Sequence, residues 1–171
     1  MKQKKNKISP VPAICSALGT IILVIIIGIC LPLTLPKALG YEVYSVISGS
    51  MEPEIPVGSL VLVKGRDASE IKEKDVIAFY GGADSRAIIT HRVVENRVLE
   101  GEFITKGDAN KAEDMNPIPY ENFIGKVELN IPELGGLAQF ISTMQGKVTV
   151  GCLIGLAAVL HLLAGVLEKR R

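Results

Sequence analysis

Two long apolar runs lie near the ends of the chain. No charged residue occurs from residue 8 to residue 36, and a second uncharged run covers residues 148–167. A helix of about 20 residues is about 30 Å long, which matches the hydrocarbon core of a bilayer. The pattern predicts a transmembrane anchor over residues 11–36 and a second transmembrane helix over residues 147–167. Pro32 and Pro36 are expected to mark the outer end of the first span, because proline ends or kinks a helix.

Short runs of apolar, β-branched and aromatic residues fill the region between the two spans. Turn signals such as Pro-Val-Gly at 56–58 and Gly-Gly at 81–82 separate these runs. Strands this short, with a turn about every ten residues, favour a small antiparallel β domain. The expected strands cover residues 41–47, 59–63, 75–80, 87–94, 97–99, 103–106 and 123–129. The fold class is therefore mainly β, with a domain over residues 37–132 between N- and C-terminal transmembrane helices.

Residues 133–146 follow a different period. The apolar residues at helical spacing are Leu134, Leu137, Phe140, Ile141 and Met144, with polar residues between them. This pattern predicts a short amphipathic helix that lies on the membrane surface before the second span. Packing of the helix against the β domain is the alternative, and the sequence does not choose between the two.

The formal charge of +1 hides a segregation of sign. Residues 1–10 contain four lysines and the chain ends in Lys-Arg-Arg, whereas residues 41–147 contain 11 Lys/Arg and 17 Asp/Glu. Cationic flanks of membrane spans stay in the cytoplasm. We therefore expect cytoplasmic tails at residues 1–10 and 168–171, and a β domain on the outer side of the cell membrane. A cleaved signal peptide is the alternative for the N-terminus, but the apolar run is longer than a usual signal-peptide core.

The charge and the cysteines exclude several classes of function. An acidic domain argues against nucleic acid as a partner, because binding of the phosphate backbone needs clustered cations. Cys15, Cys30 and Cys152 all lie in the apolar runs. This placement argues against a disulfide framework and against a cysteine-based zinc site in the polar domain.

A hydroxyl and an imidazole stand out in the domain. Residues 48–53 read Ser-Gly-Ser-Met-Glu-Pro and follow the first span by about a dozen residues. Gly49 permits a tight turn, on which Ser50 can present its hydroxyl and its own N–H together. His91 is the one histidine outside the spans, and imidazole is the usual base near neutral pH. The lysines that could replace it, at positions 64, 72, 74 and 106, do not lie in the apolar stretches that a lysine base requires.

The loop at residues 106–114 offers the carboxylates Asp108, Glu113 and Asp114. A serine hydrolase uses one carboxylate to orient its imidazole base. The spacing does not choose among the three. Calcium binding by this loop is disfavoured, because a calcium loop needs more ligands and a different glycine position. We therefore predict no metal and no cofactor.

Four segments in order resemble signal peptidase I, in the branch shared by archaea, the endoplasmic reticulum and some Gram-positive bacteria. They are residues 48–53, 74–79 (Lys-Asp-Val-Ile-Ala-Phe), 90–93 (Thr-His-Arg-Val) and 103–110 (Phe-Ile-Thr-Lys-Gly-Asp-Ala-Asn). Each segment is weak alone, but the four together beside an N-terminal anchor are specific. The resemblance covers about residues 10–130. The chain departs from the pattern at Lys74, where a glycine often precedes Asp-Val-Ile, and this departure weakens one turn.

The resemblance implies a membrane-bound serine endopeptidase that removes signal peptides from exported preproteins at small-x-small sites. Ser50 matches the nucleophile and His91 the base. Asp114 is the first choice for the acid, with Asp108 in support, and Ser48 matches a donor to the oxyanion. The implied partners are signal peptides, bound as an added strand beside residues 88–90 and the segment before Ser50, and the lipid bilayer, with translocon proximity as a further expectation.

Two rival functions remain open on the sequence. One is an anchored β module that binds exported partners without catalysis. The other is a related protease dedicated to one or a few secreted substrates. Both would keep the fold, and the first would not need Ser50.

Overall fold

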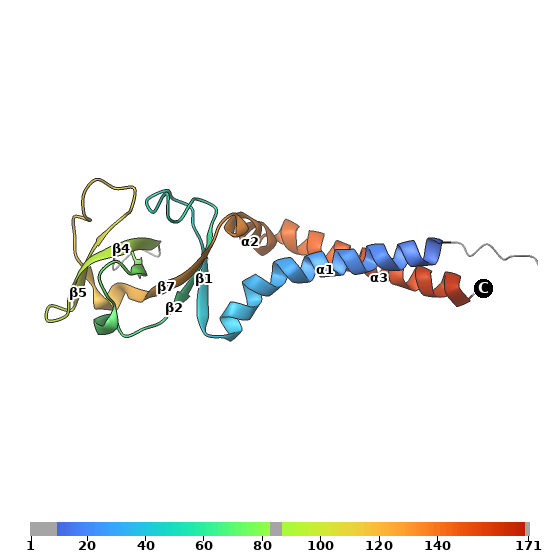
Figure 1. Cartoon of the computed structure of the whole chain (residues 1–171), viewed down its shortest axis with the longest axis horizontal. Helices are drawn as coiled ribbons and strands as arrows, with labels where there is room; N and C mark the ends of the chain where they lie inside the picture. The colour runs from blue at the N-terminus through green and yellow to red at the C-terminus, as the bar shows by residue number, and fades with distance from the viewer. Residues whose placement is uncertain (1–9, 83–86, 170–171) are drawn as a thin grey trace, which may run out of the picture. The chain divides into compact units, whose positions relative to one another are not determined.

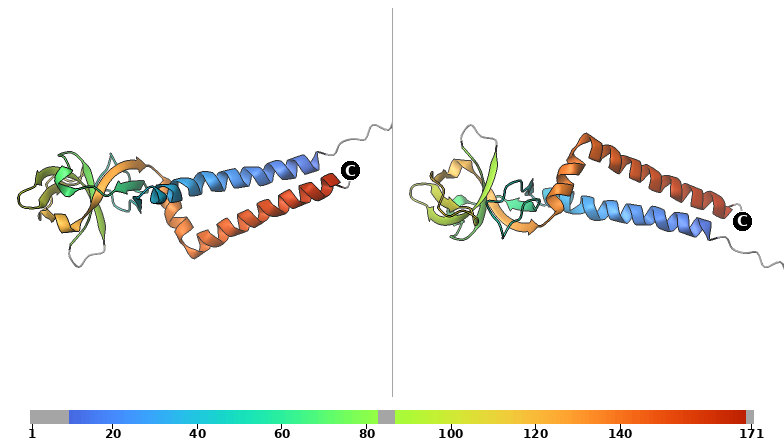
Figure 2. Two further views of the ribbon diagram at one scale, coloured as in Figure 1. Left: turned by 90° about the horizontal axis from the view of Figure 1, so that it is seen from below. Right: turned by 90° about the horizontal axis from the view of Figure 1, so that it is seen from above.

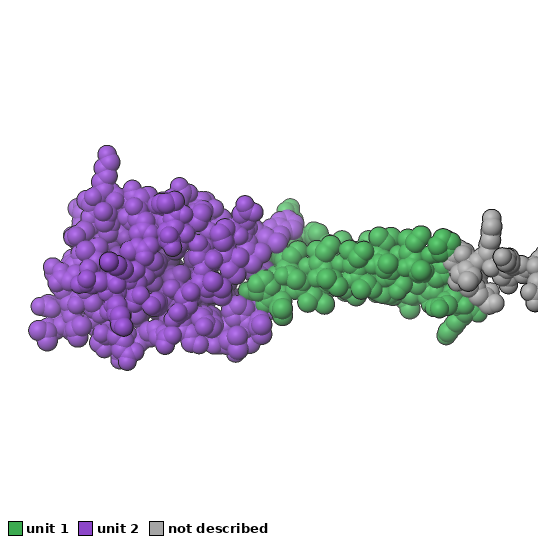
Figure 3. Space-filling model, viewed as in Figure 1, with its two compact units in different colours: residues 1–32, 141–171 green, residues 33–140 purple. Residues whose placement is uncertain are grey.

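The computed structural model describes residues 10–82 and 87–169, which fall into two compact units (Figure 3). One unit comprises residues 1–32 and 141–171 and holds most of the two long apolar helices, and the other comprises residues 33–140 and holds the β domain. Most of the two expected basic tails lies outside the described residues. The tails at the chain ends therefore stay a prediction.

The β domain is one antiparallel sheet, strongly curled (Figures 1 and 2). Within the described residues seven strands follow the order β1-β2-β7-β3-β4-β5-β6. Their bounds are β1 Tyr41–Ser45, β2 Leu60–Lys64, β3 Val76–Tyr80, β4 Ile88–Arg97, β5 Glu102–Lys106, β6 Ile118–Pro119 and β7 Phe123–Ile131, with short 3₁₀ helices at Ala68–Glu70 and Tyr120–Asn122. This architecture confirms the mainly β fold class.

The strand β3 explains why parts of the sequence read as continuous apolar runs. Successive side chains of a strand point to opposite faces of the sheet. Ile77 and Phe79 lie in a buried cluster with Val93 and Phe103, whereas Ala78 lies in a second cluster with Met51, Ile55, Val61 and Val63. Both faces of β3 are therefore covered, and neither face of this strand needs polar residues.

The strands expected at 87–94 and 97–99 are a single longer strand, β4. A register irregularity between Val93 and Glu95 bends β4 without ending it. Residue 97 belongs to the strand, because Arg97 pairs with Glu102 of β5 by register and by an ion pair of 3.2 Å. Leu99 lies in the hairpin turn and is 98% exposed. The separate strand at 97–99 was a wrong prediction, since alternation cannot distinguish a strand end from a turn.

Three helices complete the chain: α1 Val11–Ala38, α2 Leu134–Ser142 and α3 Met144–Lys169. Among the described residues, α1 and α3 are long and apolar enough to cross a membrane. Pro32 and Pro36 do not end α1, which continues to Ala38. Proline is tolerated in apolar helices where neighbouring groups satisfy the freed carbonyl.

The first turn of α2 packs against the β domain. The Gly135 N–H donates to the Gly58 carbonyl at 2.8 Å, and the Ser45 hydroxyl donates to the Gly135 carbonyl at 3.1 Å. A Cβ atom at Gly135 would lie 2.2 Å from the Ser59 carbonyl oxygen. Contact with the β domain thus applies to the start of the segment, while its place at a membrane surface stays a prediction.

Candidate active site

The segment after β1 holds Ser50 at the edge of the sheet. Its neighbour Met51 is 1% exposed, and Ile55, one turn later, is 2% exposed. The Ile55 N–H donates to the Met51 carbonyl at 2.8 Å, which closes that turn. These two apolar side chains anchor the segment in the core. Ser50 is therefore half-buried on a fixed turn, and Ser48 is exposed two residues earlier.

His91 lies in β4, opposite Ile77 of β3 in the sheet register. Its side chain is buried, at 8% exposure, and the edge of its ring meets Phe79 with the ring centroids 6.1 Å apart. The Nδ1 atom lies 2.6 Å from the Oδ2 atom of Asp114. A histidine held in this way has one ring nitrogen on a carboxylate and the other, Nε2, free to exchange protons with a neighbour.

Asp114 reaches His91 because its loop is tied to the end of β5. The Asp114 N–H donates to the Thr105 carbonyl at 2.8 Å, and the Thr105 hydroxyl donates to the same Oδ2 atom at 2.6 Å. The three acids of this loop therefore differ in their surroundings. Asp114 contacts the imidazole, and Glu113 is exposed.

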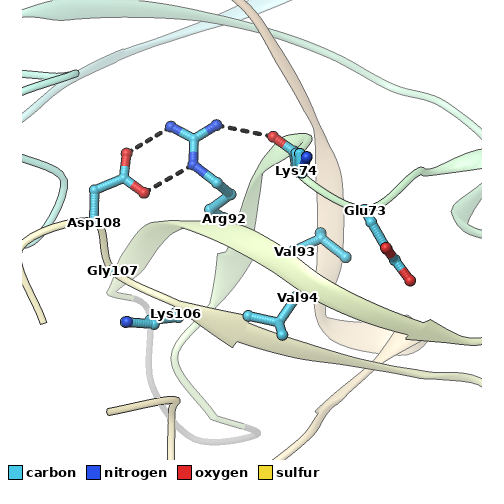
Figure 4. A pocket seen from close by; sticks show the side chains of 8 residues that line it. All are labelled: Glu73, Lys74, Arg92, Val93, Val94, Lys106, Gly107 and Asp108. Atoms are coloured by element: carbon cyan, nitrogen blue, oxygen red, sulfur yellow. Dashed lines mark hydrogen bonds and ion pairs between the residues drawn. The ribbon is translucent and has the colours of Figure 1, made fainter. Parts of the chain in front are cut away.

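Asp108 lies beside a different partner, Arg92. The two side chains form a bidentate pair, with distances of 2.8 and 2.5 Å, and Arg92 also donates to the Lys74 carbonyl at 2.8 Å (Figure 4). The hydrogen bond to Asp108, together with its charge, raises the pKa of Arg92 above its usual value. The pair joins the loop after β5 to β4, and within the described residues the side-chain bonds of Asp108 go to Arg92 and not to the imidazole.

Lys74, the departure noted in the sequence, has a left-handed backbone. Its φ of 71° is a conformation that favours glycine. The turn is kept all the same, because the Lys74 N–H donates to the Val93 carbonyl at 2.8 Å and the Lys74 carbonyl accepts from Arg92. Together with Glu73, Lys106 and Asp108, these residues border a pocket of about 340 Å³ on the side of the sheet shown in Figure 4.

Gly107 brings Ser50 and His91 together. A Cβ atom at Gly107 would lie 2.6 Å from the Ser50 carbonyl oxygen and 3.0 Å from His91 Nε2. The main chain of Ser50 and the Nε2 edge of the imidazole therefore face the same point. The next loop residues add a direct link, since the Ala109 N–H donates to the Ser50 carbonyl at 2.9 Å. The two loops lie side by side on one edge of the domain (Figure 1).

A second pocket of about 340 Å³ includes Ser48, two residues before Ser50, and Thr90, the residue before His91. It is lined by residues 44–48, Val61 and residues 87–90. In the described chain, β5 pairs with β4 only from Arg92 onward. The edge of β4 at Ile88–His91 therefore has main-chain N–H and C=O groups that are not bonded to β5. On the other wall, β1 is a terminal strand of the sheet. An extended peptide could add to these edges.

Of the sequence-predicted residues, the structure brings His91 and Asp114 into contact and places Ser50 and Ser48 at the neighbouring turn. Sequence reasoning did not single out Thr105 or Arg92. Both lie inside the motif segments. Phe103 and Thr105 are two residues apart in β5, so they lie on the same face of the strand, which the apolar Phe103 indicates to be buried. A buried threonine on such a face needs a hydrogen-bond acceptor, which is a signal that could have identified it.

Comparison with known proteins identifies relatives of one kind. Signal peptidase I W of Bacillus subtilis strain 168 is 45% identical over 91 residues, which are 51% of this chain and 46% of the relative, so the chain spans about half the length of that protein. The signal peptidase complex catalytic subunit SEC11 of Verticillium alfalfae is 31% identical over 128 residues, with 68% of this chain and 73% of the relative covered. SEC11 of Colletotrichum graminicola is 30% identical over 126 residues with the same coverage. No model of a protein family matches the chain. The two SEC11 proteins are covered over more than two thirds of their length, and the chain therefore belongs to the signal peptidase I family.

Proposed function

We propose that this chain is a membrane-anchored serine endopeptidase that removes signal peptides from exported preproteins at small-x-small sites. The observation that carries the proposal is the contact of 2.6 Å between His91 Nδ1 and Asp114, with His91 Nε2 and the Ser50 carbonyl oxygen both close to Gly107. Membership of the signal peptidase I family supports the same activity.

The proposed chemistry begins at Ser50. Asp114 holds the Nδ1–H of His91, so that Nε2 is unprotonated and takes the proton of the Ser50 hydroxyl. The serine oxygen attacks the substrate carbonyl, and the Ser50 N–H and the Ser48 hydroxyl hold the oxyanion. The imidazolium then gives its proton to the leaving amine, and water releases the acyl group. Loss of one oxyanion donor typically lowers the rate about 10²–10³-fold.

The substrate is proposed to bind as an extended strand between residues 44–48 and 87–90. The pocket of about 340 Å³ along these segments supports this placement. Tyr44, Val46 and Ile88 are partly buried around it and give it an apolar wall. Such a wall suits the small apolar side chains that precede the cleavage site, whereas the main-chain edges bind any sequence.

The bilayer is the other proposed partner. The apolar helices α1 and α3 support two spans, and the lysine- and arginine-rich chain ends support a cytoplasmic location for both termini in the cell membrane. The β domain then lies on the outer side, near the translocon where signal peptides emerge. Confining enzyme and substrate to one membrane raises their effective concentration.

The deciding experiment compares the full-length chain with Ser50→Ala on a preprotein that carries an Ala-x-Ala site. Mass spectrometry of the product locates the cut. We expect cleavage at that site by the wild type, a loss of at least about 10³-fold in Ser50→Ala, and normal cleavage by Ser69→Ala, which changes an exposed serine of a 3₁₀ helix. Equal precursor accumulation with the wild type and Ser50→Ala would contradict the proposal and favour a β module without catalysis. Cleavage of one preprotein among many tested would indicate a dedicated protease.

A further inference from the structure

The carboxylate of Asp114 has two partners on the same oxygen atom. His91 Nδ1 and the Thr105 hydroxyl each lie 2.6 Å from Asp114 Oδ2. We propose that Thr105 is a positioning residue of the active site, which fixes the Asp114 carboxylate in the orientation that holds the imidazole. The inference rests on the proposed function, and it assigns a role to a residue that contacts neither the substrate nor the imidazole in the proposed chemistry.

The place of Thr105 in the sheet makes it a rigid support. Thr105 is fully buried and lies opposite Val93 in the ladder between β4 and β5. Val93 and His91 are two residues apart on β4, so their side chains share one face of the strand with Thr105. A β-branched side chain in a strand has restricted rotation about χ1. Holding the hydroxyl against Asp114 therefore costs little side-chain conformational entropy.

The loop that carries Asp114 is tied to Thr105 twice. The main-chain bond from Asp114 N–H to the Thr105 carbonyl, at 2.8 Å, places the Asp114 backbone. That bond does not fix rotation of the side chain about χ1 and χ2, which decides where the carboxylate lies. The hydroxyl bond fixes this rotation. The Thr105 carbonyl therefore positions the Asp114 backbone, and the Thr105 hydroxyl positions the Asp114 carboxylate.

Without the hydroxyl, the carboxylate can turn away from His91 while the loop stays in place. The imidazole would then lose its partner for part of the time, and a displacement of about 1 Å in a catalytic group can lower the rate as much as 10²-fold. We therefore expect Thr105→Val, which keeps the shape of the side chain, to reduce kcat about 10- to 100-fold with KM changed less than twofold. Thr105→Ser restores the hydroxyl and should recover most of kcat.

A double-mutant cycle separates positioning from a general effect on folding. If Thr105 acts through Asp114, Thr105→Val has no further effect on kcat in an Asp114→Ala background, which removes the acceptor of the hydroxyl. An equal loss of kcat in both backgrounds would overturn the proposal. Val93→Ala is the control for a general loss of packing, because it removes apolar contacts from the same buried face and leaves the Asp114 side chain unchanged. It should lower kcat by the same factor in the wild-type and in the Asp114→Ala background.

A spectroscopic test does not need activity. The chain has two histidines, so ¹⁵N-imidazole labelling and His161→Gln leave the ring of His91 as the single signal. In full-length His161→Gln in detergent we expect a slowly exchanging, downfield Nδ1–H proton, faster exchange of that proton when Thr105→Val is added, and its recovery with Thr105→Ser. An identical proton signal in Thr105→Val would refute the positioning role. Inactivity of the wild type on preproteins would instead count against the proposed function, with the spectroscopic result still deciding on Thr105.

Discussion

Ser50 and Met51 are neighbours in the chain but have opposite surroundings. The serine is half-buried at the edge of the site, whereas Met51 is 1% exposed in a cluster with Ile55 and Val61. The turn that carries the serine is therefore anchored by the packing of Met51 and Ile55 in the core. Stability and geometry at the site are linked through one methionine.

Truncation of Met51 tests this link. We expect Met51→Ala to lower the free energy of unfolding of the β domain by about 2–4 kcal/mol, because it leaves a cavity in the core. Denaturant unfolding followed by circular dichroism measures the change. Met115→Ala is the matched control, since Met115 is 96% exposed and should change the free energy by less than about 0.5 kcal/mol. Equal effects of the two substitutions would contradict the packing of Met51.

The proposed role of His91 predicts a dependence of activity on pH. A histidine base must be neutral to accept the serine proton, so kcat/KM should decrease as the pH is lowered toward about 5. Initial rates of preprotein cleavage between about pH 5 and 9 measure this profile. His161→Gln should keep the shape of the profile, because His161 lies in α3. A flat acidic limb in the wild type would count against an imidazole base.

The residues of the site could be predicted in part. The motif segments located Ser50 and His91, since a serine on a tight turn and a lone imidazole have few equivalents in this chain. The loop residues alone did not choose among Asp108, Glu113 and Asp114, and only the family resemblance favoured Asp114, because the choice depends on how the loop after β5 folds back on that strand. The path of this loop depends on the bonds of Asp114 to Thr105 and of Asp108 to Arg92, which the sequence pattern does not reveal.

At the scale of elements, two glycines allow neighbouring segments of main chain to pack closely against each other. Gly125 of β7 would place a Cβ atom 2.4 Å from the Lys64 carbonyl oxygen, and Gly135 of α2 would place one 2.2 Å from that of Ser59. Both distances involve main-chain atoms, which cannot move aside as a flexible side chain can. Close packing at these points requires the absence of a side chain.

A pair of adjacent glycines allows a controlled test of the attachment of α2. Gly135→Ala should lower the midpoint of thermal unfolding, because its methyl group would force α2 away from the Ser59 carbonyl. A methyl group at Gly136 would meet no neighbouring atom of the described residues within 4 Å, so Gly136→Ala should be neutral or stabilise the helix by up to about 1 kcal/mol. Differential scanning fluorimetry of both variants measures the difference. A stable Gly135→Ala would show that α2 is not packed as described.

An ion pair between β3 and β7 makes stability depend on pH. Asp75, just before β3, contacts Lys126 of β7 at 2.7 Å and accepts from the Lys72 N–H at 3.0 Å. Burial opposes the charge of the Asp75 carboxylate, but the bonds from Lys126 and Lys72 and their charges outweigh burial and lower its pKa. The folded value lies below the unfolded value of about 3.9, so this stabilisation is complete above that value and is lost as the pH falls through the folded pKa.

Substitution of Asp75 should remove this dependence. We expect Asp75→Asn to lower the free energy of unfolding by about 1 kcal/mol near neutral pH, and the difference from the wild type to shrink at pH about 3. Urea unfolding at several pH values measures both effects. Glu73→Gln, at an exposed position two residues earlier, is the control and should show neither effect.

Elements were predictable where the pattern was regular and were misplaced at their boundaries. Each observed strand from β1 to β5 and β7 overlaps an expected run, because β-branched residues and turn signals alternate along the chain. The bend in β4, the hairpin turn at Leu99 and the continuation of α1 past Pro36 depend on pairing and packing partners. A sequence window contains no information about such partners.

At the scale of the whole molecule, the chain joins a disulfide-independent β domain to two apolar helices. Within the helical unit, a Cβ atom at Gly19 would lie 3.1 Å from the Ala157 carbonyl oxygen, so α1 and α3 approach each other closely there. The mainly β fold class and two apolar helices long enough to cross a membrane followed from the pattern and the lengths of the apolar runs. The orientation in the membrane is a proposal from the distribution of charge.

Epitope tags test the proposed orientation in intact cells. Tags at the N-terminus and at the C-terminus should both be protected from an external protease, because cationic chain ends stay in the cytoplasm. A tag inserted after Leu99, in the exposed hairpin turn, should be cleaved from outside. Permeabilised cells, in which all three tags become accessible, provide the control. External cleavage of either terminal tag would contradict the orientation.

The hydrogen bond between the Ala109 N–H and the Ser50 carbonyl affects which substitutions the site tolerates. Both partners are main-chain groups, so almost any exposed side chain at position 109 leaves the fastening between the two loops intact. Two residues earlier, at Gly107, even a methyl group would strike the Ser50 carbonyl oxygen. A library randomised at both positions would retain wide diversity at one and a single residue at the other. The candidate site thus tolerates many residues at position 109, where the loops are linked by main-chain atoms, and only glycine at position 107, where they are in close contact.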